Sequence, residues 1–130
     1  AIYVAPGDFH LCLVGNEKKI VARLDQGPKR NFVRPAVDPL FESAAEIFKS
    51  RCLAFVLTGM GMDGKDGAEA VKAAGGFVVI QEESSCTVFG MPGAVKAAGA
   101  FDRMATPEEI ADILNEKVAV ETGMKRAVGG

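Results

Sequence analysis

A glycine-rich segment at residues 58–67, TGMGMDGKDG, has the composition of a catalytic or anion-binding loop. Its glycines, at positions 59, 61, 64 and 67, permit unusual backbone conformations and free main-chain N–H groups to converge on an anion or a developing oxyanion. Asp63 lies in its middle, where a carboxylate can orient a histidine, bind a metal or cap a helix. Asp66 is the better placed helix cap, so we expect Asp63 to lack an obvious structural role. A tight turn with solvated aspartates remains the alternative.

A second segment, residues 81–92, carries candidate nucleophiles in Ser84, Ser85 and Cys86. None of them lies in a GxSxG pattern, and no base is close to them in the sequence. We therefore expect turn or packing roles for all three side chains.

Other side chains with chemical potential are scattered along the chain. His10, the only histidine, lies in an apolar run, which favours a strand-surface histidine over a general base. Arg34 could bind a carboxylate through two hydrogen bonds, but a surface ion pair is the expectation. Met60, Met62 and Met91 could line an apolar pocket or fill gaps in the core.

Two classes of site are disfavoured by residue spacing. The glycine-rich segment matches neither GxxxxGK[ST] nor GxGxxG, so nucleotide binding is weakly supported. Cys12, Cys52 and Cys86 are far apart and form no CxxC pair, which argues against a zinc site or a disulfide framework. We expect reduced thiols, no metal and no other cofactor.

Secondary-structure patterns indicate which elements position these segments. Extended runs at 9–14 and 19–24 flank a Gly-Asn turn and predict a β-hairpin within residues 1–24, preceded by a short strand at 1–4. Helices and strands are expected to alternate over 37–121, with a tail at 122–130. The predicted order is a helix near Pro39 with Asp38 as its cap, a strand at 53–57, a helix at 68–74, a strand at 77–80, a helix at 92–98, and a helix opened by a capping box at 106–109.

This alternation is typical of an α/β sheet with crossover helices. The strands at 53–57 and 77–80 are uninterrupted apolar runs, as expected of central strands buried on both faces. Sites in open α/β sheets lie beyond the carboxyl ends of the strands. The two strands lead into the glycine-rich and the serine-containing segments, so any site is expected there.

The composition bounds the class of protein. The 130 residues suffice for one domain, and 48% of them are apolar, so a sizeable core can form. Lys and Arg number 15 against 17 Asp and Glu, which argues against a nucleic-acid partner. No apolar run approaches the ~20 residues that cross a bilayer, and the first residues do not fit a signal peptide. The chain starts at Ala1 rather than at Met, which suggests a piece of something longer.

Four sequence blocks together resemble the methylesterase domain of the CheB family of chemotaxis response regulators. Each block is modest alone, but their joint order from Ala5 to Pro92 is highly specific. The blocks are APGDFH at 5–10, RPAVDPLF at 34–41, LTGMGMDG at 57–64 and QEESSCTVFGMP at 81–92.

The resemblance implies a three-layer, Rossmann-like, mostly parallel α/β sheet with an antiparallel N-terminal hairpin. It implies hydrolysis of glutamate γ-methyl esters on methyl-accepting chemotaxis receptors, and deamidation of receptor glutamines, through a Ser-His-Asp triad. Asp63 corresponds to the triad aspartate, which would hold the imidazole in its tautomer and stabilise its protonated form. The main-chain N–H of Met60 would lie at the oxyanion site.

The same resemblance shows what this chain lacks. The family serine lies in a GxSxGG block and its histidine in a QHMP-like block, both preceding APGD, and neither block is present. His10 and Ser85 match family residues that are not catalytic. The chain thus resembles the C-terminal part of the catalytic domain, truncated at its N-terminal side, and we expect it to be inactive alone.

The implied partners are the cytoplasmic helices of methylated chemoreceptors and, in the intact protein, a regulatory receiver domain. We expect a cytoplasmic location, with no nucleic-acid partner and no membrane insertion. The alternative is a non-catalytic α/β binding module whose glycine-rich loop binds an anion or a partner.

Overall fold

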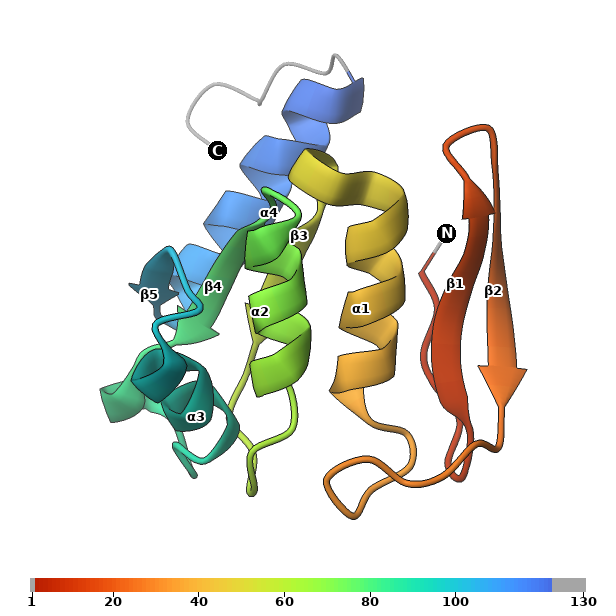
Figure 1. Ribbon diagram of the computed structural model, residues 1–130. Coiled ribbons are helices and arrows are strands. Elements are labelled where there is room, and N and C mark those ends of the chain that lie inside the picture. Colours follow the sequence, from red (N-terminus) through yellow and green to blue (C-terminus); the bar gives the residue numbers. More distant parts are fainter. Residues whose placement is uncertain (1, 123–130) are drawn as a thin grey trace.

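The computed structural model describes residues 2–122, in which helices and strands alternate after an N-terminal pair of strands (Figure 1). The strands are β1 (His10–Asn16), β2 (Lys19–Asp25), β3 (Leu53–Val56), β4 (Phe77–Gln81) and β5 (Arg103–Ala105). The helices are α1 (Val37–Phe48), α2 (Lys65–Ala73), α3 (Met91–Ala98) and α4 (Pro107–Thr122), with short 3-10 turns η1 (Lys49–Arg51) and η2 (Glu83–Ser85).

The N-terminal hairpin is confirmed. β1 pairs with β2 in antiparallel register from His10↔Asp25 to Asn16↔Lys19. The Asn16 side chain closes the turn, since its Oδ1 accepts hydrogen bonds from the N–H groups of Lys18 and Lys19. The predicted strand at the N-terminus is wrong for residues 2–4, because no described strand lies beside them and Val4 is 85% exposed.

The second sheet is parallel, in the order β3-β4-β5. β4 is central, and Val78, Val79 and Ile80 are completely buried, as its apolar run predicts. The same prediction is wrong for β3, which is an edge strand: Leu53 and Phe55 are only half-buried. β5 was not predicted, because three residues are too short to show a period.

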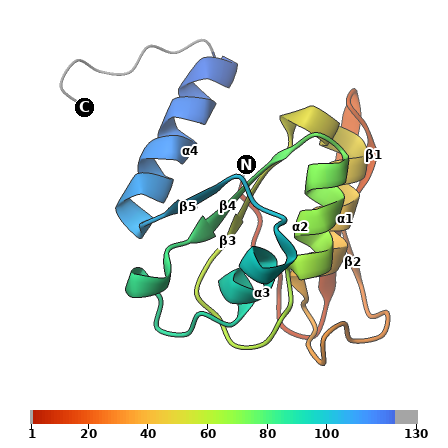
Figure 2. The same cartoon turned by 60° about the vertical axis from the view of Figure 1, so that its left-hand side comes forward.

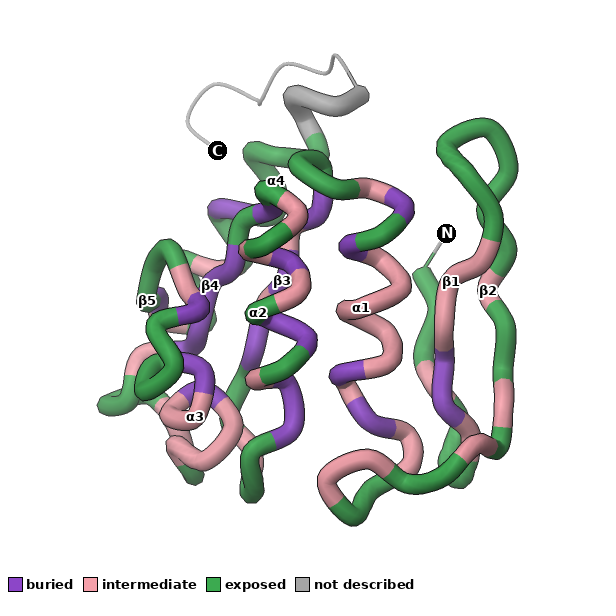
Figure 3. The backbone as a smooth tube through the Cα atoms, viewed as in Figure 1, coloured by how far each residue is buried: buried purple, intermediate pink, exposed green. Residues whose placement is uncertain are grey.

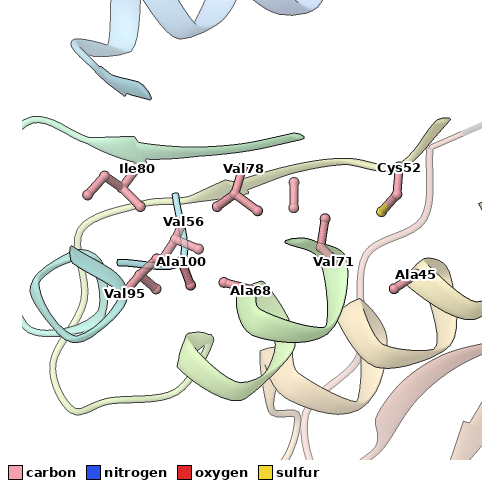
Figure 4. Packing of buried hydrophobic residues seen from close by; sticks show 10 residues of the cluster. Ala45, Cys52, Val56, Ala68, Val71, Val78, Ile80, Val95 and Ala100 are labelled. Carbon is pink, nitrogen blue, oxygen red and sulfur yellow. The ribbon is translucent and has the colours of Figure 1, made fainter. Parts of the chain in front are cut away.

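Helices cover both faces of this sheet, which gives the three layers (Figure 2). One face packs against α1, α2 and α3, with Val56, Val71, Ile80 and Val95 among the buried side chains of that core (Figure 4). The other face packs against α4, where Val79 and Ala105 meet Ile113. The hairpin lies outside α1, to which it is tied by the Leu13 N–H donating to Ser43 Oγ at 2.9 Å (Figure 1).

Burial decreases from the sheet outward, so the two sheet-covering cores carry the fold (Figure 3). The capping box of α4 is confirmed: the Thr106 N–H donates to Glu109 Oε1 at 3.1 Å, and the Glu109 N–H donates to Thr106 Oγ1 at 3.3 Å. Residues 123–130 of the predicted tail lie outside the described residues, and residue 122 belongs to α4.

Candidate active site

The loop between β3 and α2 places Asp63 against the start of α1. The residue is only 6% exposed. Its Oδ2 accepts a hydrogen bond from the Val37 N–H at 2.6 Å, and its Oδ1 accepts one from the Asp38 N–H at 3.2 Å. These N–H groups belong to the first turn of α1, and N–H groups in a first turn have no acceptor within their own helix. Asp63 therefore caps α1, and the expectation that it lacks a structural role is wrong.

Asp38 performs the same task for α2. It is completely buried, and its Oδ1 accepts hydrogen bonds from the N–H groups of Gly64 at 3.0 Å and Gly67 at 2.8 Å. The predictions that Asp38 caps its own helix and that Asp66 caps α2 are both wrong. The side chain of Asp66 is 59% exposed and makes no cap hydrogen bond.

Gly67 allows this exchange of caps, because it lets the two helices approach closely. A Cβ atom at this position would lie 2.6 Å from Phe41 Cβ and 3.1 Å from Asp38 Oδ1. Both distances are shorter than ordinary side-chain contacts. Gly67, the third residue of α2, is therefore needed for close packing rather than for an unusual backbone conformation.

Asn31 joins the two carboxylates. Its Nδ2 donates to Asp38 Oδ2 at 2.8 Å and to Asp63 Oδ1 at 3.2 Å. The residue lies between β2 and α1, where the sequence patterns predict no helix or strand. No local signal identifies Asn31, because both of its partners are brought to it by helix packing.

Asp63 retains room for one further donor. An ionised carboxylate offers about four acceptor positions. In the described part of the chain, Oδ1 receives two hydrogen bonds and Oδ2 receives one. The open position on Oδ2 can accept an imidazole N–H, which is the bond that a triad aspartate makes.

His10 cannot be that imidazole in this fold. It is 3% exposed, its Nε2 bonds the Pro28 carbonyl at 2.8 Å, and its Nδ1 accepts from the Ala36 N–H at 3.2 Å. The expectation of a strand-surface histidine is wrong, since the ring is buried. Both nitrogens are used to anchor the hairpin to the segment before α1.

The loop that carries Met60 is braced by the loop after β4. Gly59 forms an isolated parallel bridge with Phe89, and its carbonyl accepts hydrogen bonds from the N–H groups of Gly90 and Met91 at 3.1 and 2.9 Å. A Cβ atom on Gly90 would lie 2.7 Å from the Gly59 carbonyl oxygen. The two loops therefore meet at the carboxyl edge of the sheet, as their parallel strands require.

Met60 itself projects outward from this braced loop. The residue is 83% exposed, and no described residue accepts a hydrogen bond from its main-chain N–H. Met62 is 54% exposed, so neither methionine is gap-filling core. Within residues 2–122, the Met60 N–H thus has no acceptor in the protein.

Gln81 is a connecting residue that sequence patterns did not single out. It ends β4 and is 5% exposed. Its Oε1 accepts from the Thr58 N–H at 2.8 Å, and its Nε2 donates to the Ser85 carbonyl at 2.9 Å. The sequence contains one signal for this role: Gln81 is a polar residue at the end of the apolar run that forms β4.

The candidate nucleophiles of the second loop have structural partners. Ser85 Oγ donates to the Glu82 carbonyl at 2.8 Å, and Ser84 Oγ donates to Glu82 Oε1 at 2.7 Å. Burial raises the pKa of the Cys86 thiol, which keeps it protonated. The expectation of turn roles is confirmed for Ser84 and Ser85 by these contacts.

Remaining candidates lie away from Asp63. Arg34 forms the predicted ion pair, with Asp8, and the hydrogen bond from Arg34 is the main reason that the pKa of Asp8 is lowered.

A groove of about 730 Å³ lies between the hairpin turn and the C-terminal half of α1, lined by residues such as Leu13 and Glu46. None of the residues around Asp63 lines it. Within residues 2–122 no group of acidic, His or Cys side chains is arranged to hold a metal, and no helix is long and apolar enough to cross a membrane.

Comparison with known proteins gives a consistent family. Residues 1–114 match the family model described as CheB methylesterase. A Maricaulis maris protein named protein-glutamate methylesterase/protein-glutamine glutaminase is 48% identical over 103 residues, which are 79% of this chain and 26% of that protein. A Thermotoga maritima protein of the same name is 46% identical over 117 residues, 90% of this chain and 34% of that protein.

The fold agrees as well. The crystal structure of the Thermotoga maritima CheB methylesterase catalytic domain matches with a TM-score of 0.84 and 46% identity, covering 88% of this chain and 60% of that one. This chain therefore spans about a quarter to a third of these relatives, and somewhat more than half of the solved catalytic domain.

Proposed function

The chain belongs to the CheB methylesterase family, and from that membership we propose that the intact protein hydrolyses glutamate γ-methyl esters of methyl-accepting chemotaxis receptors. The names of the relatives pair this esterase with a glutaminase, so the same centre would also deamidate receptor glutamines. The single observation that carries the proposal is the buried carboxylate of Asp63, held by three donors with one acceptor position open.

The proposed mechanism is that of a serine hydrolase. A serine hydroxyl attacks the γ-carbonyl carbon while a histidine takes its proton, and the imidazolium then protonates the departing methoxide to give methanol. Water hydrolyses the acyl-enzyme in the same way. The serine and the histidine would come from the part of the family domain that this chain does not span.

In this scheme Asp63 accepts the imidazole N–H that faces away from the serine. Its contribution is to hold the tautomer and to stabilise the imidazolium, while remaining ionised itself. The Val37 and Asp38 N–H groups support this role, because they solvate the carboxylate in a nearly water-free position.

The Met60 main-chain N–H would donate to the oxyanion of the tetrahedral intermediate. Its exposure and its lack of an acceptor among the described residues favour this role. Bracing by the loop after β4 would keep the N–H in place before the substrate arrives, which is what oxyanion stabilisation requires.

The proposed setting is the bacterial cytoplasm. The substrates would be the cytoplasmic helices of methylated receptors, and a receiver domain of the intact protein would be the regulatory partner. The near-balanced charge, 15 Lys and Arg against 17 Asp and Glu, agrees with a protein rather than a nucleic-acid partner.

The decisive experiment measures methanol release from methylated receptor by the intact protein. Asp63→Asn should lower turnover by roughly 10³–10⁴-fold, the scale seen when a triad aspartate loses its charge. Asp66→Asn is the matched control, because that side chain is exposed in the first turn of α2, three residues after Asp63, and should leave turnover near normal. Near-normal turnover of Asp63→Asn would contradict the triad role.

The isolated 130-residue chain should release no methanol, since one triad member cannot supply the others. Activity of that chain would show that the assignment is wrong. The rival proposal, a non-catalytic binding module, is tested by the sequence upstream of Ala1: a GxSxGG block followed by QHMP supports the esterase, and an initiator Met directly upstream supports the module.

A further inference from the structure

We propose that Asn31 is a positioning residue for the hydrolytic reaction, because its side-chain amide fixes the plane of the Asp63 carboxylate by tying it to Asp38. The inference rests on the proposed function, in which Asp63 orients the histidine. It concerns a residue that touches neither the substrate nor the imidazole.

The orientation of the Asn31 amide is determined by its partners. Its Nδ2 faces two carboxylate oxygens, Asp38 Oδ2 at 2.8 Å and Asp63 Oδ1 at 3.2 Å. An amide NH₂ group has two N–H donors, so it can serve both oxygens at once. One amide thus joins two buried carboxylates.

The backbone holds Asn31 at this position. Arg30 and Val33 exchange two backbone hydrogen bonds, at 3.1 and 3.0 Å, around Asn31 and Phe32. Both central residues have positive φ, 53° and 67°, as in a type I′ turn, where asparagine is among the favoured residues. The turn lies in the middle of the connection from β2 to α1, residues 26–36 (Figure 1).

Arg30 ties this turn to α1. Its guanidinium donates to both carboxylate oxygens of Glu42, at 3.0 and 2.6 Å, and the hydrogen bond to Glu42 is the main reason that the pKa of Arg30 is raised. Asp63 caps the start of the same helix. The turn that holds Asn31 and the carboxylate of Asp63 are therefore both tied to α1 by hydrogen bonds.

The third hydrogen bond matters because the terminal torsion of an aspartate side chain is soft. Without Asn31, Oδ2 keeps the Val37 N–H at 2.6 Å, but Oδ1 keeps only the Asp38 N–H at 3.2 Å, so the carboxylate is less firmly held against rotation about its bond to Cβ. Rotation would move the open acceptor position of Oδ2 away from the imidazole. A misplacement of about 1 Å in a catalytic group costs up to about 100-fold in rate.

The test uses Asn31→Gly in the intact protein, since glycine tolerates the positive φ and removes only the amide. The expected result is a 10- to 100-fold lower kcat for methyl-ester hydrolysis, with KM within about twofold of normal. Asn16→Gly is the matched control, because Asn16 is also a turn asparagine whose side chain makes two hydrogen bonds, but it lies in the hairpin turn. The kcat of the Asn16→Gly protein should be unchanged.

A second readout separates positioning from stability. The rate at which a fluorophosphonate labels the serine should fall in Asn31→Gly in parallel with kcat, at a temperature where the variant is fully folded. Normal kcat and labelling with only a lower Tm would overturn the proposal. If Asn31→Gly does not fold, Asn31→Ala is measured in the same way, because it removes the amide without the added backbone freedom of glycine and without a new carboxylate beside Asp38 and Asp63.

The outcomes also separate this inference from the proposed function. An inactive Asp63→Asn combined with a fully active Asn31→Gly refutes the positioning role alone. An active Asp63→Asn refutes the triad role and the positioning role together. Loss of kcat in both variants, with Asn16→Gly unaffected, supports both.

Discussion

Asp38 and Asp63 cap each other's helices: Asp63 accepts N–H groups of α1, the helix that contains Asp38, and Asp38 accepts N–H groups of α2, the helix that follows Asp63. The exchange locks α1 and α2 together at the edge of the sheet where the candidate active site lies. It also gives the proposed catalytic carboxylate a second, structural task.

Removing the Asp38 side chain should weaken the fold more than removing a neighbouring exposed carboxylate. We expect Asp38→Ala to lower the free energy of unfolding of the intact protein by about 2–3 kcal/mol, because two helix N–H groups and the Asn31 amide lose a charged acceptor. Urea unfolding measures the loss. Asp66→Ala, with an exposed side chain, should stay within about 0.5 kcal/mol, and equal losses for the two variants would count against the capping role.

Gly67→Ala should destabilise the protein although it lies within a helix. In an ordinary helix interior this change stabilises by about 0.5–1 kcal/mol. Here the new methyl group meets Phe41 Cβ at 2.6 Å, so a loss of about 1–3 kcal/mol is expected in thermal or urea unfolding. Gly7→Ala is the control, since nothing lies within 4 Å of its added Cβ. A stabilised Gly67→Ala protein would refute the close approach of α1 and α2.

Asp102 should make stability depend on pH in the acidic range. Burial opposes its ionisation, but the hydrogen bonds from Lys72 and from the Val78 N–H outweigh burial and lower the pKa of its carboxyl. A lowered folded-state pKa stabilises the fold above the unfolded value of about 3.9, and this stabilisation disappears as the pH falls through the folded-state value.

Asp102→Asn should therefore be less stable than the unmodified protein at pH 7, and the difference should shrink as the pH is lowered below about 4. Urea unfolding of both proteins across this range is the measurement. A difference that stays constant from pH 7 to pH 3 would show that the charge of Asp102 is not involved.

The 130-residue chain by itself should self-associate. Among the described residues, no strand pairs with the outer edge of β3, and Leu57, at the end of that strand, is 50% exposed. Unpaired edges and exposed apolar side chains favour association. Light scattering should detect oligomers, which Leu57→Lys should reduce. A clean monomer of the unmodified chain would contradict this expectation.

Several elements could be predicted because their signals are local. The apolar run of β4, the Gly-Asn hairpin turn and the capping box before α4 each depend on residues close in sequence. β5 could not be predicted, because its three residues are too few to show a pattern. Asp63 was found through the composition of its loop, and its proposed role through the resemblance of four sequence blocks.

The residues whose roles the sequence patterns did not predict, or predicted wrongly, share one property: their partners are distant in the sequence. Asn31 and Gln81 each bridge segments that are distant in sequence, and His10 is buried by the connection that precedes α1. The expected caps Asp38 and Asp66 were assigned to the nearest helix, which is the only choice that spacing offers.

The sequence by itself determined the alternation of helices and strands, the edge of the sheet at which a site could form, and the family, because periodicity, turn residues and motif blocks are properties of neighbouring residues. Only the tertiary structure decided that Asp63 caps α1, that Asp38 caps α2 and that Asn31 ties the two carboxylates together. These bonds exist because α1 packs against α2 without a side chain at Gly67 between them, and such a contact has no signature within either helix.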